Sequence, residues 1–294
     1  MKTLQSSIII LMILMSLNAC KDPGTNIEDF DRASLLTNVA DNLIIPHYQV
    51  MQSKMSEFTN NLNAFNANPN QTTLDNLRTS WLDAYKQWQH CKVYELGEAA
   101  NNALRTSINT YPTDTSQIND NIISGSYNLG TIVNIQAIGF PAFDYLLFFN
   151  SDANIISETS TSANLRQYYV DLASKMTTEI DFVLNDWINS YRSTFISSTG
   201  SASGSSTNNL YNEFVYDLEL IKNAKYGIPL GKDILDVARP TYVEAYYSGN
   251  SNLLAIENMK SIENLFLGRS ITGVDGIGFD DYCDHVEAKR GSED

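Results

Sequence analysis

Residues 74–91 read LDNLRTSWLDAYKQWQHC and carry the clearest helical pattern in the chain. Their apolar side chains recur at alternating steps of three and four residues, at Leu74, Leu77, Trp81, Ala84, Trp88 and Cys91. With about 3.6 residues per turn, these steps place the side chains on one stripe of a helix. Such a stripe is buried against other helices. The pattern therefore predicts a core helix in which Cys91 is a small buried thiol rather than a redox group.

Helical periodicity continues on both sides of this segment. Between residues 30 and 65 it is interrupted by Pro46, which removes a backbone hydrogen bond and predicts a bend near Ile45. A long helix is predicted over residues 162–195, and shorter ones over 210–226, 242–247, 253–267 and 280–289. Residues 101–131 predict a loop with a helical fragment at 104–108. No strand alternation of useful length is present, so the predicted fold class is all-α with two packed helical bundles.

The N-terminus has the pattern of an export signal. Lys2 precedes an apolar run from Ile8 to Leu17, which is too short for a membrane span and typical of a signal peptide. Ala19 directly before Cys20 resembles a bacterial lipobox, in which the cysteine is acylated and becomes the mature N-terminus. Two or more acyl chains anchor a protein stably in a membrane. We therefore predict a lipoprotein of the cell envelope, on the periplasmic face or the surface of an outer membrane; an ordinary cleaved signal is the alternative.

These patterns divide the chain into four predicted parts. Residues 1–19 are the signal peptide and residues 20–29 a lipid-anchored tether. An N-terminal helical bundle follows over residues 30–155, and a C-terminal bundle over residues 156–294. Within the second bundle, residues 197–209 contain only Ser, Thr, Gly, Ala and Asn and predict a flexible loop.

The charge composition of the chain indicates which binding partners it can have. The 294 residues include 34 Asp plus Glu against 19 Lys plus Arg, a net charge of −15, and no basic run. Nucleic acid is excluded as a partner, because phosphate binding needs clustered Lys and Arg. Once Cys20 is acylated, only Cys91 and Cys283 remain, and two distant cysteines do not make a disulfide scaffold. We expect a monomer whose fold depends on its apolar core.

Residues 139–148, GFPAFDYLLF, contain the most unusual carboxylate of the chain. Pro141 suits the first turn of a helix, where its missing N–H would be unpaired anyway. Asp144 then lies near the positive end of the helix dipole, which is a sufficient structural reason for a carboxylate. Its helical neighbours, however, are Phe140, Leu147 and Phe148, and burial among them would raise its pKa. Both a structural and a site-lining role follow from the pattern.

The same stretch resembles the site motif of the imelysin-like family, helical cell-envelope proteins classed among peptidases. The family signature is GxHxxE followed by Tyr-Leu-Leu and an aromatic residue. Here Gly139 fits the signature, whereas Pro141 stands at the histidine position and Asp144 at the glutamate position. Residues 42–48, 81–97, 225–232 and 243–251 are also similar to family segments. The resemblance covers most of residues 30–282.

This resemblance implies a binding cleft between the two bundles at the helix that carries Asp144. The expected lining of the cleft is Gly139, Pro141, Asp144, Glu244, Ser248 and Ser251. Asp144 and Glu244 are the candidate ligands of a divalent or ferric metal ion. Ordinary helix caps explain part of this set as well, because Thr241 and Glu244 have capping-box spacing. Ser251 or Asn252 likewise suits the start of the next helix.

Three functions remain open from the sequence. Pro141 supplies neither the nitrogen nor the proton of a histidine, which favours a non-catalytic lipoprotein that binds a small ligand, metal complex or peptide. The family's contexts link such a protein to iron or metal uptake. The second hypothesis is a metal-dependent or acid–base peptidase in which Asp144, Glu244 and His47 converge in three dimensions. The third is a structural scaffold lipoprotein whose cleft is filled by aromatic side chains. None of His47, His90 and His285 has metal-ligand spacing.

Overall fold

The computed structural model describes residues 29–232 and 237–288, and within these ranges every regular element is a helix. The predicted all-α class is therefore confirmed. The predicted signal peptide, Cys20 and most of the tether lie outside the described residues. The principal helices are α2 (Arg32–Asn38), α3 (Ile45–Ala67), α4 (Gln71–Cys91), α8 (Gly139–Phe148), α10 (Ala163–Asp186), α12 (Ser206–Leu220) and α13 (Ser251–Phe266). Shorter helices are α5 (Glu98–Asn101), α6 (Leu104–Asn109), α7 (Thr115–Ser124), α9 (Asp152–Thr161), α11 (Arg192–Ser197) and α14 (Phe279–His285).

The proline in the first long segment acts where the sequence predicts. A π-helical turn over Val39–Ile44 separates α2 from α3, and Pro46 lies in the first turn of α3. Proline has no N–H to donate and its ring clashes with the carbonyl of residue i−4, so it fits where the regular i→i−4 bonding is already interrupted by the π-helical turn. Two further π-helical turns follow α10 at Trp187–Tyr191 and α12 at Ile221–Gly227. Such turns are rare and mark places where a helix departs from regular hydrogen bonding.

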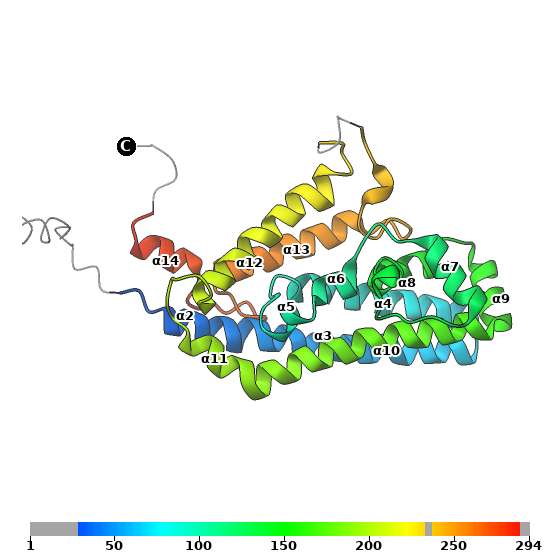
Figure 1. Cartoon of the computed structure of the whole chain (residues 1–294), viewed down its shortest axis with the longest axis horizontal. Helices are drawn as coiled ribbons and strands as arrows, with labels where there is room; N and C mark the ends of the chain where they lie inside the picture. The colour runs from blue at the N-terminus through cyan, green and yellow to red at the C-terminus, as the bar shows by residue number, and fades with distance from the viewer. Residues whose placement is uncertain (1–28, 233–236, 289–294) are drawn as a thin grey trace, which may run out of the picture. The chain divides into compact units, whose positions relative to one another are not determined.

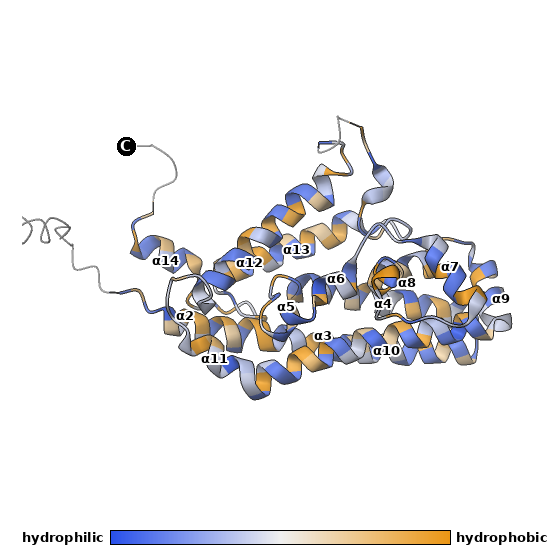
Figure 2. Ribbon diagram, viewed as in Figure 1, coloured by the Kyte–Doolittle hydropathy of each residue, from blue (hydrophilic) through white to orange (hydrophobic). Residues whose placement is uncertain are grey.

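Helix α4 lies at the centre of the packing. It packs against α3 on one side and α13 on another, and α10 runs along α3 (Figure 1). The predicted stripe is buried, since Trp81, Trp88 and Cys91 each have no exposed surface. Hydrophobic and hydrophilic residues alternate along the helices, as the colours of Figure 2 show. Helices from both sides of residue 155 therefore share contacts, while the division into two bundles stays a prediction.

Two predicted helical segments differ from the structure. Residues 242–247 form no α-helix: a short 3₁₀ turn covers Pro240–Tyr242, and Ala245 adopts a left-handed φ of 51°. Backbone contacts to Asp144, described below, hold this segment in turns. Helix α12 starts at Ser206, inside the predicted 197–209 loop, because Ser205 caps it by accepting a hydrogen bond from the amide of Asn208. The flexibility of the remaining loop stays a prediction.

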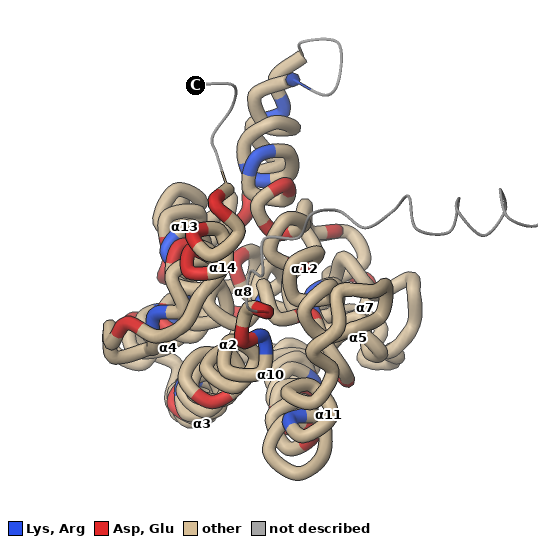
Figure 3. The backbone as a smooth tube through the Cα atoms, turned by 90° about the vertical axis from the view of Figure 1, so that its left-hand side faces the viewer, with Lys and Arg blue, Asp and Glu red and all other residues tan. Residues whose placement is uncertain are grey.

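Residues Arg32–Asp281 form one compact unit, which holds all the contacts of the candidate site. The described residues outside this unit are 29–31 and 282–288, where the ring of Phe30 packs edge-on against Tyr282 at 5.1 Å. Lys and Arg are scattered over the described helices rather than gathered in a stripe (Figure 3). Among the described helices, none combines the length and the apolar composition of a membrane span.

Candidate functional site

Helix α8 begins with a glycine that no other residue could replace without strain. Gly139 has a φ of 76°, and a Cβ at this position would lie 2.1 Å from the carbonyl oxygen of Ile108. The backbone of α8 can therefore approach the end of α6 closely. Pro141 follows in the first turn, as predicted, and both residues are buried. This close approach fixes where the rest of α8, including Asp144, lies.

The side chain of Asp144 holds the chain segment that follows Glu244. Its side chain is 2% exposed, and its carboxylate accepts hydrogen bonds from the amide N–H groups of Tyr247 (2.8 Å) and Ser248 (3.0 Å). Burial raises the pKa of Asp144, while these hydrogen bonds act in the opposite direction and the nearby Glu244 raises it further. The predicted burial is thus present, and so are the donors that satisfy the carboxylate.

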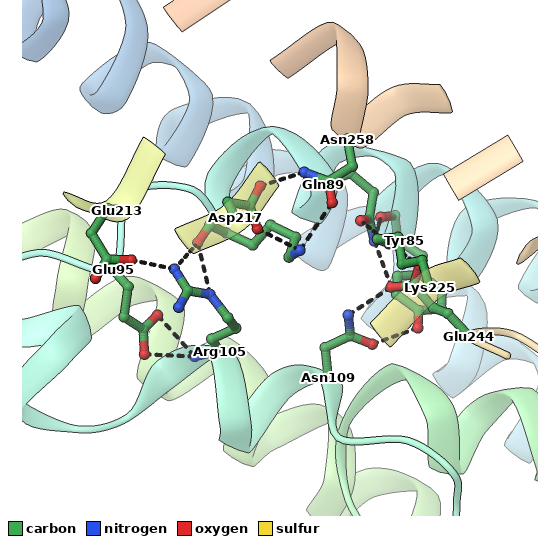
Figure 4. A network of polar contacts seen from close by, with 11 residues as sticks. Tyr85, Gln89, Glu95, Arg105, Asn109, Glu213, Asp217, Lys225, Glu244 and Asn258 are labelled. Atoms are coloured by element: carbon green, nitrogen blue, oxygen red, sulfur yellow. Dashed lines mark hydrogen bonds and ion pairs between the residues drawn. The ribbon is translucent and has the colours of Figure 1, made fainter. Parts of the chain in front are cut away.

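Glu244 belongs to a buried ion pair rather than to a helix cap. Its carboxylate pairs with Lys225, and both side chains are almost completely buried. The same carboxylate accepts hydrogen bonds from the amides of Asn109 (2.7 Å) and Gln89 (3.0 Å), as Figure 4 shows. Lys225 also donates to Gln89 Oε1 at 2.9 Å. Both charged groups thus have hydrogen-bond partners besides each other, which a buried ion pair requires.

The charges of this pair shift both pKa values. Burial acts to raise the pKa of Glu244, but attraction to Lys225 and Lys92 overcomes it and the pKa lies below its ordinary value. Burial lowers the pKa of Lys225 to about 8, against the pull of the Glu244 carboxylate. Both groups are therefore charged at neutral pH.

A second buried pair extends the network. Lys92 pairs with Asp217 at 2.6 Å and donates to Asn258 Oδ1 at 3.0 Å. Arg105 continues it by pairing with Glu213 at 2.6 Å and by donating to the Lys92 carbonyl (Figure 4). Burial opposes ionisation of Asp217, yet Lys92 and Arg105 hold its pKa below the ordinary value. The two pairs form a polar layer between α4, α12 and α13.

A small pocket opens above this layer, beside Asp144. Its volume is about 180 Å³, smaller than the ~300–1,000 Å³ of a drug-sized site. Chain segments before α7, in α8 and before α13 contribute its lining: Tyr111, Pro112, Thr113, Pro141, Asp144, Thr241, Val243, Ala245, Tyr246 and Tyr247. The pocket thus combines aromatic surfaces, hydroxyl groups and one carboxyl group. We refer to it as the Asp144 pocket.

The structure brings together part of the predicted set. Asp144 and Pro141 line the Asp144 pocket, and Ser248 contacts Asp144 through its backbone. Glu244 is buried behind it. Ser251 does not cap α13: the N-cap position is Asn250, and the Ser251 hydroxyl donates to the carbonyl of Glu244. The predicted capping box at Thr241 is also wrong, because no α-helix starts there.

His47 does not join Asp144 and Glu244. Its ring stacks on His90 at 5.2 Å, and its polar partner is Gln87, whose amide contacts Nδ1 at 3.2 Å. Burial, with the nearby His90, lowers the pKa of His47 to about 3, so the ring is neutral at physiological pH. His90 contacts Glu257 at 3.0 Å. In the described part of the chain, no group of three or more His, Cys, Asp and Glu residues is placed to hold a metal ion.

Sequence reasoning missed Lys225, Lys92 and Asp217 as members of the site. One signal was present: Tyr85, Gln89 and Lys92 recur at steps of four and three beside the apolar stripe of α4. That spacing puts three polar groups on one inward face, where buried polar groups need partners. Tyr85 donates to Asn109 at 2.5 Å and its ring stacks on Phe140 at 4.5 Å. The network therefore contacts α8 directly.

The fold and the site define a class of all-α protein in which a buried polar network contacts the helix that carries the Gly139–Asp144 motif. The chain belongs to the imelysin family, peptidase M75, whose sequence profile matches residues 44–293. No curated protein matches it.

Two solved structures are similar to the chain. One is described as an iron-regulated protein A precursor from Parabacteroides distasonis, with 18% identity and a TM-score of 0.72, over 87% of this chain and 79% of that one. The other is an imelysin-like protein from Psychrobacter arcticum, with 19% identity and a TM-score of 0.64, over 81% and 74%. At these identities the likeness shows the fold alone.

Proposed function

We propose that this protein is a non-catalytic binding protein of the cell envelope, and that it holds a small iron chelate in the Asp144 pocket. The observation that carries the proposal is that Asp144 binds backbone amides of the pocket wall. Both oxygens of its carboxylate accept backbone amides, so the group positions the pocket wall at Tyr247 and Ser248. A general base would need its lone pairs directed at a substrate proton.

The neighbouring groups support the same role. Pro141 lines the pocket at the position where the family motif has histidine, and it can neither accept nor donate a proton. Glu244 is neutralised by Lys225 and bonded by two amides. These contacts favour a structural role for Asp144 and Glu244 in the pocket wall over a role as an acid–base pair in catalysis.

The pocket lining favours an iron complex over a bare ion. Burial and the carboxylates of Glu244 and Asp217 raise the pKa of Tyr111 well above its ordinary value, so this wall of the pocket carries a neutral phenol. Thr113 and Thr241 add hydroxyl groups. Hydroxyl donors suit the carboxylate oxygens of an organic chelator. The iron link itself rests on the description of the Parabacteroides distasonis protein.

The proposed location rests on the N-terminal sequence. Acylation of Cys20 would anchor a monomer at the periplasmic face or the surface of an outer membrane, with residues 20–29 as tether. Mass spectrometry of the membrane fraction should find acyl chains on a peptide that starts at Cys20. Recovery of an unmodified N-terminus from the soluble fraction would contradict the anchor.

Binding can be measured by titration calorimetry with ferric citrate, with iron-free citrate as a second probe. We expect saturable binding of ferric citrate that Tyr246→Ala weakens roughly tenfold, because an exposed aromatic side chain at a binding pocket carries a large share of the energy. Tyr226→Ala is the matched control, since Tyr226 is 39% exposed, Tyr246 is 45% exposed, and Tyr226 does not line the pocket. No binding of ferric citrate, or equal weakening by both variants, would contradict the proposal and favour a scaffold role.

A further inference from the structure

A second pocket, larger than the Asp144 pocket, is lined by residues at the end of α8. Its volume is about 350 Å³, within the usual range for small-molecule sites. Helices α7, α8, α9 and α10 contribute its lining: Asn119, Ile122, Tyr145, Leu146, Phe149, Asn150, Ile155, Glu158, Ser162, Leu165 and Tyr169. None of these residues lines the Asp144 pocket. We refer to it as the Phe149 pocket.

An aromatic shelf forms one side of this pocket. Phe149 is 61% exposed although it is a large apolar side chain next to a polar helix terminus. Its ring packs on Tyr145 at 4.9 Å, and both rings pack on Tyr247, at 5.6 and 5.2 Å. Tyr247 therefore connects the shelf to the segment that Asp144 holds. An exposed ring on a rigid support is typical of a binding surface.

Polar groups line the pocket together with the shelf. Asn119 bonds the Tyr145 hydroxyl at 3.2 Å, and Asn150 donates to Glu158 Oε1 at 3.4 Å. Ser162 adds a hydroxyl group. No Lys, Arg or His is among the lining residues, all of which lie in the described part of the chain. The pocket thus offers amides, hydroxyls and one carboxylate, all of which can bond the hydroxyl groups of a ligand.

We propose that the Phe149 pocket binds a neutral sugar. One face of a sugar ring carries C–H groups, which pack on the electron-rich face of an aromatic ring, while its hydroxyls bond amides and carboxylates. A quaternary ammonium ligand fits less well, because it needs rings placed around it. Here Phe149 is the exposed ring of the cluster, and Tyr145 and Tyr247 pack against it.

The test uses methyl β-galactoside, with galacturonate and choline as comparison probes, titrated into the purified protein and followed by ligand-observed NMR. We expect a millimolar Kd for the galactoside and weaker binding of the other two probes. Phe149→Ala should weaken galactoside binding roughly tenfold, since the stacking surface is lost. Phe182→Ala is the matched control: this phenylalanine is 52% exposed on α10 and does not line the pocket. It should leave the Kd unchanged.

A third variant separates a sugar from a cation. Glu158→Gln keeps a hydrogen-bond acceptor but removes the charge, so galactoside binding should change less than threefold, within about 0.7 kcal/mol. Absence of galactoside binding, an equal Kd for wild type and Phe149→Ala, or tighter choline binding that Glu158→Gln abolishes would each overturn the proposal. Loss of ferric citrate binding would not, because that probe tests the Asp144 pocket.

Discussion

Replacing Asp144 with Ala would leave two amide N–H groups without an acceptor. The amides of Tyr247 and Ser248 both donate to this carboxylate, at 2.8 and 3.0 Å. They follow Ala245, which adopts a left-handed φ of 51° that nothing in its own side chain favours. The segment should therefore open more often in Asp144→Ala, while the helical core stays folded.

The magnitude follows from the two hydrogen bonds. A hydrogen bond to a charged group contributes about 1.5–3 kcal/mol, so the pair contributes about 3–6 kcal/mol. Burial of the carboxylate, which raises the pKa of Asp144, opposes this contribution. We therefore take about 2 kcal/mol as the net loss, within the ~1–3 kcal/mol that an unsatisfied hydrogen-bonding group costs, which corresponds to a roughly 30-fold larger equilibrium population of the opened segment.

Amide hydrogen exchange of a peptide that covers residues 244–250 measures this opening directly. Asp114→Ala is the matched control, because Asp114 accepts a single amide hydrogen bond from Gln117 at 3.0 Å as the N-cap of α7. It should speed exchange in α7 and leave residues 247 and 248 unchanged. Unchanged exchange at Tyr247 and Ser248 in Asp144→Ala would refute the structural role of Asp144.

Three further predictions concern the buried network and the start of α8. Lys225→Met should lower the free energy of unfolding by about 3–5 kcal/mol in a urea titration, because it leaves Glu244 charged, buried and unpaired; Lys222→Met, whose side chain is 70% exposed, should change it by less than about 0.5 kcal/mol. A loss in Lys225→Met no larger than that in Lys222→Met would contradict a buried charged pair. The folded pKa of Glu244 lies below its ordinary 4.5, so its contribution is complete above pH 4.5 and lost as the pH falls through the folded pKa. Unfolding of Glu244→Gln should accordingly depend less on pH in this acid window, and identical slopes would count against the shift. Gly139→Ala should destabilise the protein by more than about 1 kcal/mol, since its Cβ would meet the Ile108 carbonyl oxygen, whereas Gly204→Ala, with open space around it, should cost less; equal melting temperatures would exclude the close approach.

Much of the fold could be predicted from local patterns. The stripe of α4 and the break at Pro46 follow from helical period and proline chemistry, and both appear in the structure. The segment 242–247 could not be predicted in this way. Its apolar and aromatic content suits a helix, but the acceptor that holds it in turns is Asp144, about a hundred residues earlier in the chain.

Local patterns predict the candidate site less completely than the fold. Burial of Asp144 could be predicted from its helical neighbours, because periodicity gives the face on which a residue lies. Its partners could not, since they are backbone amides of a distant turn. Lys225 and Glu244 come together with Gln89 and Asn109 from four separate segments, and no spacing in the sequence encodes that pairing.

The most direct test of the central claim is a search for cleavage products. Purified protein is incubated with an unfolded polypeptide such as reduced casein, with and without added Fe(III) or Zn(II), and fragments are identified by mass spectrometry. The use of Asp144 as a backbone anchor predicts the same fragments as buffer alone, in wild type and in Asp144→Ala. New fragments produced by wild type and absent with Asp144→Ala would show that this carboxyl group is catalytic, and would contradict the assignment as a binding protein.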